Sequence, residues 1–162
     1  MTIAQIGIFV IQLETIAMNK RPILLVAEKD SNSFQLMKTQ LRDSGCCISI
    51  VRFSSGWALL DFLAVAELAD YMSIKNFVVL IDMDLPEING MKVLKMIKRG
   101  RNSKKLPVVM MTENQDPAEI SQGHDLGCGG FIRKPVETEE LFSAFEKLNV
   151  PLVSKEIREI VV

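Results

Sequence analysis

The sequence predicts an α/β fold with a doubly wound, five-stranded parallel sheet and helices on both faces. Uncharged runs of apolar and β-branched residues, such as the run at 77–81, are typical of strands buried on both faces. Five predicted strands alternate with segments whose apolar residues recur at helical spacing. With 162 residues, 48% of them hydrophobic and 24% charged, the chain suits one domain with a substantial core.

The first half of the chain contains two predicted strands, Ile23–Ala27 and residues 47–53, and a helix follows each of them. Asp30 or Ser31 is expected to cap the first helix, which ends at Gly45. The apolar residues expected on the two helices are Phe34, Leu36, Met37 and Leu41, then Trp57, Leu59, Leu60, Leu63 and Leu68, with Trp57 packed. A loop at 69–76 leads into the central strand, Phe77–Asp82.

The second half of the chain continues the alternation of strands and helices. Its predicted elements are a helix at 91–99, a basic loop at 100–105, a strand at 107–112, a helix starting at Pro117, a glycine-rich turn at 127–130, a strand at 131–133 and a helix at 139–148. Thr138 is expected to cap the last helix. The residues expected to face inward are Val93, Leu94, Met96 and Ile97, then Leu141, Phe142 and Phe145.

The two ends of the chain are expected to lie outside the core domain, which we place at residues 20–150. Residues 1–19 form an apolar extension without a basic leader or a small-residue cleavage site, and they are too short to span a bilayer. This extension is a loose appendage, an artefact of a true start at Met18, or a segment that docks on a partner or a membrane surface. Residues 151–162 form a short tail.

Charge and cysteine content narrow the classes of function. The net charge is −1 without long blocks of like charge, so a nucleic-acid-binding surface is not indicated. Cys46, Cys47 and Cys128 lack metal-ligand spacing and are expected to be buried, reduced thiols of a cytoplasmic protein. His124, the only histidine, has no carboxylate or cysteine at ligand spacing and is expected to be a surface or packing residue.

Polar residues follow four of the predicted strands. Right-handed crossovers bring the carboxyl ends of these strands to one edge of the sheet, where open α/β sheets bind ligands. The residues expected at this edge are Glu28, Lys29, Asp30, Asp82, Asp84, Thr112 and Lys134. Two carboxylates on one loop, Asp82 and Asp84, favour a bound cation or a raised pKa.

The segment from Asp82 through Pro86 to Gly90 resembles the phosphoacceptor segment of two-component response regulator receiver domains. Thr112 follows Asp82 by 30 residues, and Lys134, followed by Pro135, comes 22 residues later, as in that family. The resemblance covers roughly residues 20–148 and implies a flavodoxin-like sheet of order 2-1-3-4-5. Within the family, the chain is most similar to stand-alone receivers that partner phytochrome-like histidine kinases.

The resemblance implies a role for each residue at the edge. Asp82 would accept the phosphoryl group, Thr112 and Lys134 would bind its oxygens, and Phe131 would be the aromatic switch. The ligands of Mg²⁺ would be Asp82, Glu28, Asp30 and the backbone carbonyl of Asp84.

Two positions depart from the family pattern in a way that bears on this chemistry. Lys29 stands where a second metal-ligating acid is usual, so Asp30, or Glu28 by a one-residue slip, would have to serve instead. Glu113 stands where a small residue is usual, and its carboxylate would repel a phosphodonor. We expect weakened binding of Mg²⁺ and slow phosphorylation.

Three functions remain open from the sequence. The first is a stand-alone regulator that takes a phosphoryl group from a histidine kinase or phosphotransfer protein and changes its binding to a downstream protein; a homodimer is left open. The second is a pseudo-receiver that binds a partner without phosphorylation, favoured by Lys29 and Glu113. The third, least favoured, is a haloacid-dehalogenase-type phosphohydrolase with Asp82 as nucleophile and Asp84 as general acid. We do not expect an enzyme beyond self-phosphorylation from small donors and self-dephosphorylation.

Overall fold

A computed structural model describes residues 2, 4–5, 7–8, 22–46, 48–68 and 77–150 of the chain. The loop expected at 69–76, the tail at 151–162, most of the extension at 1–19 and Cys47 lie outside the described residues. No helix in the described part is both long and apolar enough to cross a membrane.

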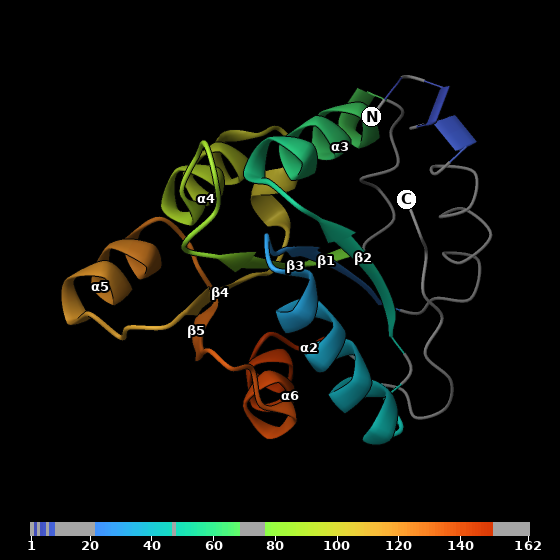
Figure 1. Ribbon diagram of the computed structural model, residues 1–162. Helices are drawn as coiled ribbons and strands as arrows, with labels where there is room; N and C mark the ends of the chain where they lie inside the picture. Colours follow the sequence, from blue (N-terminus) through green and yellow to red (C-terminus); the bar gives the residue numbers. More distant parts are fainter. Residues whose placement is uncertain are drawn as a thin grey trace.

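Five parallel strands form one sheet in the order β2-β1-β3-β4-β5, as predicted (Figure 1). The strands are β1 (Ile23–Ala27), β2 (Ser49–Phe53), β3 (Phe77–Asp82), β4 (Val108–Thr112) and β5 (Gly130–Arg133). Asp82 pairs with Met111, and Thr112 pairs with Arg133. This register brings the ends of β3, β4 and β5 to one edge, where the polar residues follow.

Helices cover both faces of the sheet (Figure 1). The helices α2 (Ser31–Asp43) and α6 (Thr138–Lys147) lie on one face, and α3 (Gly56–Leu68), α4 (Gly90–Arg99) and α5 (Pro117–Asp125) lie on the other. A 3₁₀ turn, η2 (Ser103–Lys105), joins α4 to β4. This is the doubly wound arrangement that the sequence predicts.

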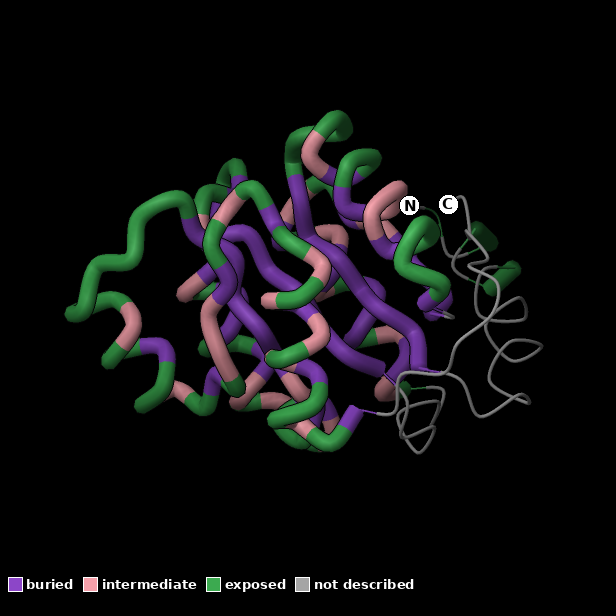
Figure 2. The backbone as a smooth tube through the Cα atoms, turned by 90° about the horizontal axis from the view of Figure 1, so that it is seen from below, coloured by how far each residue is buried: buried purple, intermediate pink, exposed green. Residues whose placement is uncertain are grey.

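The core consists of two layers separated by the sheet, because successive strand residues point to opposite faces. Ile23 and Leu25 of β1 pack toward α3 and α4, whereas Leu24 and Val26 pack toward α2 and α6. All five residues of β1 and all six of β3 are buried, and the strands form the buried centre of the molecule (Figure 2). This double burial explains why the strands read as uninterrupted apolar runs.

Side chains cap the N-termini of three helices, α2, α4 and α5, which begin after the carboxyl ends of strands. Asp30 caps α2, as predicted, and accepts hydrogen bonds from the amides of Asn32 and Ser33. Asn89 caps α4 and Asp116 caps α5 in the same manner. The predicted cap at Thr138 is wrong, because α6 begins at Thr138 itself and Glu137 precedes it without a side-chain capping bond.

Several apolar residues expected to be packed are exposed instead. The exposed fractions are 49% for Leu36, 43% for Trp57, 88% for Leu68 and 42% for Met96. Leu36 and Met96 each lie about 100° around the helix from a buried neighbour, Met37 or Ile97, which takes the inward position. Phe142 is only half-buried. Cys46 and Cys128 are buried, as predicted.

Candidate functional site

Asp82 ends the central strand β3 and is 1% exposed. Its Oδ1 accepts a hydrogen bond of 2.9 Å from the backbone amide of Asp84. Its Oδ2 lies 2.8 Å from the ammonium Nζ of Lys134, which follows β5. Both oxygens of this buried carboxylate are therefore held by the protein, one by an amide and one by a cation.

Glu28 follows β1 and is also 1% exposed. Its Oε2 lies 2.8 Å from the same Nζ of Lys134, and its Oε1 accepts a hydrogen bond of 2.8 Å from the amide of Asp30. Lys134 thus bridges two buried carboxylates that come from different strands. Two negative charges face one ammonium, so the acid pair of Glu28 and Asp82 retains net negative charge.

The environment of Lys134 raises the pKa of its ammonium group. Burial by itself would lower this pKa, but the hydrogen bonds and charges of Asp82 and Glu28 outweigh it. The backbone amide of Lys134 also donates to the carbonyl of Thr112 at 2.9 Å. This bond anchors the residue to the end of β4 and directs its side chain along the edge of the sheet.

The loop between β3 and α4 depends on Gly90. A Cβ atom at this position would lie 2.4 Å from the carbonyl oxygen of Asp82 and 2.9 Å from the Cα of Met83. Without a side chain, Gly90 can donate its amide to the carbonyl of Met83 at 3.0 Å. The start of α4 is therefore pressed against the backbone of Asp82, which fixes the direction of its carboxylate.

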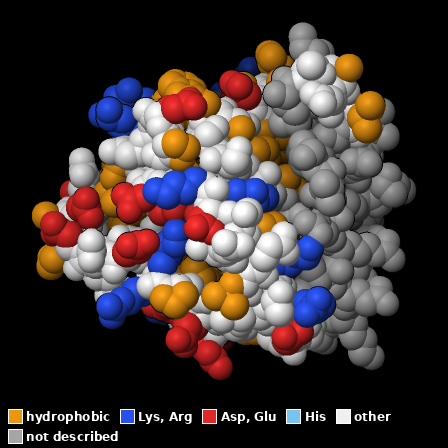
Figure 3. Space-filling model, viewed as in Figure 1, with side chains coloured by type: hydrophobic (Ala, Val, Ile, Leu, Met, Phe, Trp, Pro, Cys, Tyr) orange, Lys and Arg blue, Asp and Glu red, His pale blue; other side chains and the backbone are white. Residues whose placement is uncertain are grey.

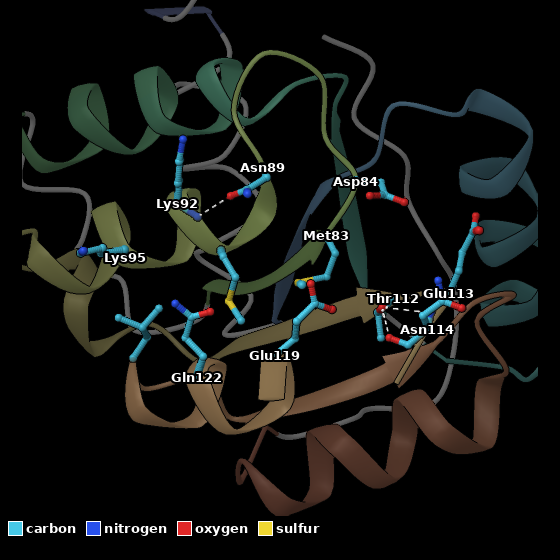
Figure 4. A pocket seen from close by; sticks show the side chains of 12 residues that line it. Met83, Asp84, Asn89, Lys92, Lys95, Thr112, Glu113, Asn114, Glu119 and Gln122 are labelled. Atoms are coloured by element: carbon cyan, nitrogen blue, oxygen red, sulfur yellow. Dashed lines mark hydrogen bonds between the residues drawn. The ribbon is translucent and has the colours of Figure 1, made fainter. Parts of the chain in front are cut away.

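Thr112 ends β4, but its hydroxyl is engaged within its own loop. The hydroxyl donates to the carbonyl of Asn114 at 2.6 Å and accepts from the amide of Asn114 at 3.2 Å (Figure 4). The structure therefore places Thr112 at the predicted edge, while its hydroxyl is turned toward Asn114. Glu113, the next residue, is exposed.

A cavity of about 480 Å³ opens between α4 and α5 beside Thr112. Met83 and Glu119 point toward each other across it, and Gln122 extends from α5 near the same space (Figure 4). Lys92 and Lys95 of α4 also line the cavity. It connects the end of β4 to the faces of two helices, so a movement of the β4–α5 loop would change its shape.

Phe131 lies beneath α5, where the absence of a side chain at Gly123 makes room for its ring. A Cβ atom at Gly123 would lie 2.4 Å from Cζ of Phe131. The ring also meets the imidazole of His124 edge to face, at 5.6 Å between centroids. His124 is exposed, in agreement with the surface or packing role expected for it.

The loop between β1 and α2, residues 28–30, is called the acidic loop here. Two of its residues, Lys29 and Asp30, make no contact with Lys134 like that of Glu28. Asp30 is exposed, and its carboxylate caps α2; the amides of Ser33 and Asn32, with the charges of Lys134 and Arg52, lower its pKa. Both capping bonds go to the same oxygen of Asp30, Oδ1. The side chain of Lys29 is exposed at the same loop.

The acid pair fits a hard divalent cation, although with few acidic ligands. Glu28 and Asp82 offer carboxylate oxygens, which Mg²⁺ prefers, and their net negative charge favours a cation. Among the described residues, however, no three His, Cys, Asp or Glu side chains gather closely enough to hold a metal. A cation would need backbone carbonyls and water to complete its coordination.

Arg52 is a contributor to this edge that the sequence analysis missed. It lies in β2, and its guanidinium donates to the backbone carbonyls of Glu28 and Lys29. The available signal was a single charged residue within an otherwise uncharged predicted strand. The packing of Gly123 against Phe131 was missed as well, because the sequence alone does not show which side chain packs against a glycine.

Comparison with known proteins agrees with this geometry. The family model of the response regulator receiver domain matches residues 24–146. The two-component response regulator ARR3 of Arabidopsis thaliana is 26% identical over 140 residues, which are 84% of this chain and 60% of ARR3. The probable transcriptional regulator ycf29 of Pyropia yezoensis is 33% identical over 82 residues, 50% of this chain and 37% of that protein. The chain thus spans less than two thirds of either relative.

Among solved structures, the bacteriophytochrome response regulator AtBRR superposes with a TM-score of 0.67. It is 31% identical in sequence, and the match covers 82% of this chain and 95% of that structure.

Proposed function

This chain belongs to the response regulator receiver domain family, and from this premise we propose that it accepts a phosphoryl group on Asp82 from a histidine kinase or a phosphotransfer protein. The observation that carries the proposal is the position of the Lys134 ammonium, 2.8 Å from both Asp82 and Glu28. A buried carboxylate held beside a fixed cation, at the carboxyl end of a central strand, suits transfer of a charged phosphoryl group.

In the proposed reaction, a carboxylate oxygen of Asp82 attacks the phosphorus of a phosphohistidine. The new P–O bond forms as the P–N bond breaks, and the imidazole of the donor leaves with the electron pair of that bond. Lys134 offsets the charge on the phosphoryl oxygens as a compact cation. The amide of Asp84 holds the other carboxylate oxygen of Asp82 in place.

The receiver family binds Mg²⁺, and in this chain Glu28, Asp82 and the backbone carbonyl of Asp84 would hold it. When bound, Mg²⁺ supplies positive charge that neutralises the phosphoryl oxygens. Lys29 adds a positive charge to the same loop, and we propose that it weakens this binding. The test is a titration of the parent and of Lys29→Asp with Mg²⁺, in which we expect the variant to bind more tightly.

The proposed response to phosphorylation starts at Thr112. Its hydroxyl leaves the carbonyl of Asn114 and donates to a phosphoryl oxygen, which moves the β4–α5 loop. Phe131 and the cavity between α4 and α5 then change shape, and a downstream protein binds the altered face. We propose that the domain acts in this way in the cytoplasm, without turnover of an external substrate.

Similarity to a bacteriophytochrome response regulator supports a phytochrome-like histidine kinase as the class of phosphodonor. The competing function is a pseudo-receiver that binds its partner without phosphate. It is favoured by the exposed Lys29 at the acidic loop and by the exposed carboxylate of Glu113 beside Thr112.

The first experiment is intact-protein mass spectrometry after incubation with acetyl phosphate and Mg²⁺, beside the near-isosteric control Asp82→Asn. We expect a gain of one phosphoryl group in the parent and none in the control. A gain in both proteins would place the phosphate elsewhere. No gain with acetyl phosphate, followed by none with phytochrome-like histidine kinases, would contradict the proposal and favour the pseudo-receiver.

A further inference from the structure

Arg52 reaches from β2 to the loop that follows β1. Its Nε donates to the backbone carbonyl of Glu28 at 3.0 Å, and its Nη2 donates to that of Lys29 at 2.8 Å. The guanidinium carbon lies 5.9 Å from the centre of the Phe34 ring in α2, within the range of a cation–π contact. Arg52 therefore touches both the acidic loop and the helix that begins there.

The same loop is also tied to β2 through its backbone. The amide of Glu28 donates to the carbonyl of Phe53 at 3.0 Å. Together with the two bonds from Arg52, this contact fixes the backbone from which the Glu28 carboxylate reaches Lys134. Because a guanidinium stays protonated at all working pH values, Arg52 brings a permanent positive charge to this position.

Positively charged side chains therefore lie at the acid pair and on the loop that carries Glu28. Lys134 lies between the carboxylates of Glu28 and Asp82, while Arg52 and Lys29 place two further cationic side chains on the adjoining loop. Acidic and basic side chains also lie among one another across the middle of the face seen in Figure 3. A divalent cation at the acid pair would be repelled by each of these protein cations.

We propose that Arg52 is a positioning residue whose fixed charge lowers the affinity of the Glu28–Asp82 pair for a divalent cation. In this view the negative charge of Glu28 and Asp82 is offset mainly by Lys134 and Arg52, and less by a bound cation. The inference deepens the proposed function, since it concerns regulation of the same site by its metal. It assigns a role to a residue of β2, a strand that contributes no ligand.

The test measures binding of Mn²⁺ to the full chain by the loss of the free-ion EPR signal, with Mg²⁺ as competitor. The variants Arg52→Gln and Arg52→Met remove the charge, Arg52→Lys keeps it, and the exposed Arg99→Gln is the matched control. We expect the charge-neutral variants to bind at least about threefold more tightly at low ionic strength, with Arg52→Lys and Arg99→Gln within about twofold of the parent. Screening should shrink the gain at about 0.5 M salt.

Two neutral variants are used because they disturb the fold differently. Gln retains a donor for one carbonyl, whereas Met retains an apolar stem over Phe34. Unchanged or weaker binding in a variant that keeps the circular dichroism of the parent would overturn the inference. So would an equal gain in Arg52→Lys, a gain insensitive to salt, or unfolding of both neutral variants, which would make Arg52 a purely structural residue.

This result is separable from the proposed function. Metal affinity is measured without a phosphodonor, so a chain that takes no phosphoryl group and still responds to Arg52→Gln would contradict only the proposed function. Conversely, a phosphorylated parent whose Arg52 variants bind Mn²⁺ unchanged would contradict only this inference. Lys29→Asp, expected to tighten binding by adding a carboxylate to the loop, shows that the assay responds to the charge of the loop.

Discussion

Lys134 joins two buried carboxylates whose charges would otherwise repel each other. Its side chain is 12% exposed, and those of Glu28 and Asp82 are each 2% exposed. A pair of this kind is not a large net source of stability, because bringing the charges out of water offsets much of their attraction. Removing only the ammonium of Lys134 lowers stability, however, because the carboxylates of Glu28 and Asp82 are then left buried without a partner.

We expect Lys134→Met to lower the free energy of unfolding by about 3–5 kcal/mol at neutral pH, as measured by urea denaturation. The neighbouring, exposed Arg133→Met is the matched control and should change it by less than about 0.5 kcal/mol. Adding Glu28→Gln to Lys134→Met should recover part of the loss, because one buried charge is then removed. A loss under about 1 kcal/mol in Lys134→Met would contradict the bridging role.

The raised pKa of Lys134 also predicts the response to alkaline pH. A basic group whose pKa is higher in the folded state than in the unfolded chain contributes its full stability below the unfolded value, here 10.5. That contribution is lost as the pH rises through the folded pKa. The difference in unfolding free energy between the parent and Lys134→Met should therefore narrow above about pH 10.5 and stay constant between about pH 7 and 9.

At the scale of elements, helix α3 is tied to the η2 turn by Glu67. Its Oε1 accepts hydrogen bonds from the amides of Asn102 at 2.9 Å and Ser103 at 2.7 Å. The amide of Ser103 is the largest influence that holds the pKa of Glu67 below its ordinary value. This contact joins two segments that are far apart in the sequence and positions the start of β4.

Glu67→Gln should lower the free energy of unfolding by about 0.5–1 kcal/mol at pH 7, because the amides lose a charged acceptor and keep a neutral one. A carboxyl whose pKa is depressed by folding contributes stability above its unfolded pKa, here 4.5, and loses it as the pH falls through the folded value. The difference should therefore shrink as the pH falls below about 4.5 and vanish only once the carboxyl is protonated in the folded state as well. The exposed Glu146→Gln is the control; an equal effect in both would contradict the prediction.

The contact between α5 and β5 rests on Gly123, into whose vacant side-chain position the ring of Phe131 fits. We expect Gly123→Ala to lower the free energy of unfolding by about 1–2 kcal/mol, because steric conflict outweighs the gain in helix propensity. In a Phe131→Ala background, the same change should raise it by up to about 1 kcal/mol. A double-mutant cycle in thermal or urea unfolding measures this reversal; equal effects in both backgrounds would refute the contact.

At the scale of the whole molecule, the sequence was sufficient for the order of elements and for the residues at the edge of the sheet. Strands buried on both faces must be apolar throughout, so Ile23–Ala27 and Phe77–Asp82 were recognisable, and polar residues at their ends had to meet. The side chains of Trp57 and Leu36 were misjudged, because an apolar residue on a helix does not reveal which neighbour takes the inward position.

The hydrogen bonds within the site were harder to predict than the identity of the residues that lie there. The hydroxyl of Thr112 binds Asn114, and Arg52 binds two carbonyls of another strand's loop. Such bonds depend on side-chain rotamers and on loop backbones, which periodicity does not encode. The bridge from Lys134 to Glu28 and Asp82 has a clearer origin, because Glu28 and Asp82 end or follow the neighbouring strands β1 and β3. The long side chain of Lys134 reaches both carboxylates from the end of β5, which lies beyond β4 at the same edge.

Among the residues that the structure describes, those of the two core clusters all lie between Ile23 and Val150. We therefore expect a fragment of residues 20–150 to unfold cooperatively, within about 1 kcal/mol of the full chain and with a similar urea m-value. Urea denaturation of both proteins tests this prediction. A broad or absent transition in the fragment, with the full chain cooperative, would show that the terminal segments belong to the folding unit.

Helix α5 buries only Gly123 fully, although it covers the end of the sheet next to Thr112. Hydrophobic free energy scales with the apolar area removed from water, so shifting this helix exposes little and costs little compared with shifting α3 or α4. We therefore expect alternative placements of α5 to differ less in energy than those of α3 or α4, and each 1.4 kcal/mol of preferential binding by a partner would change their ratio about tenfold. A binding partner with a modest preference for one placement of α5 would therefore be enough to shift the population of the domain toward it.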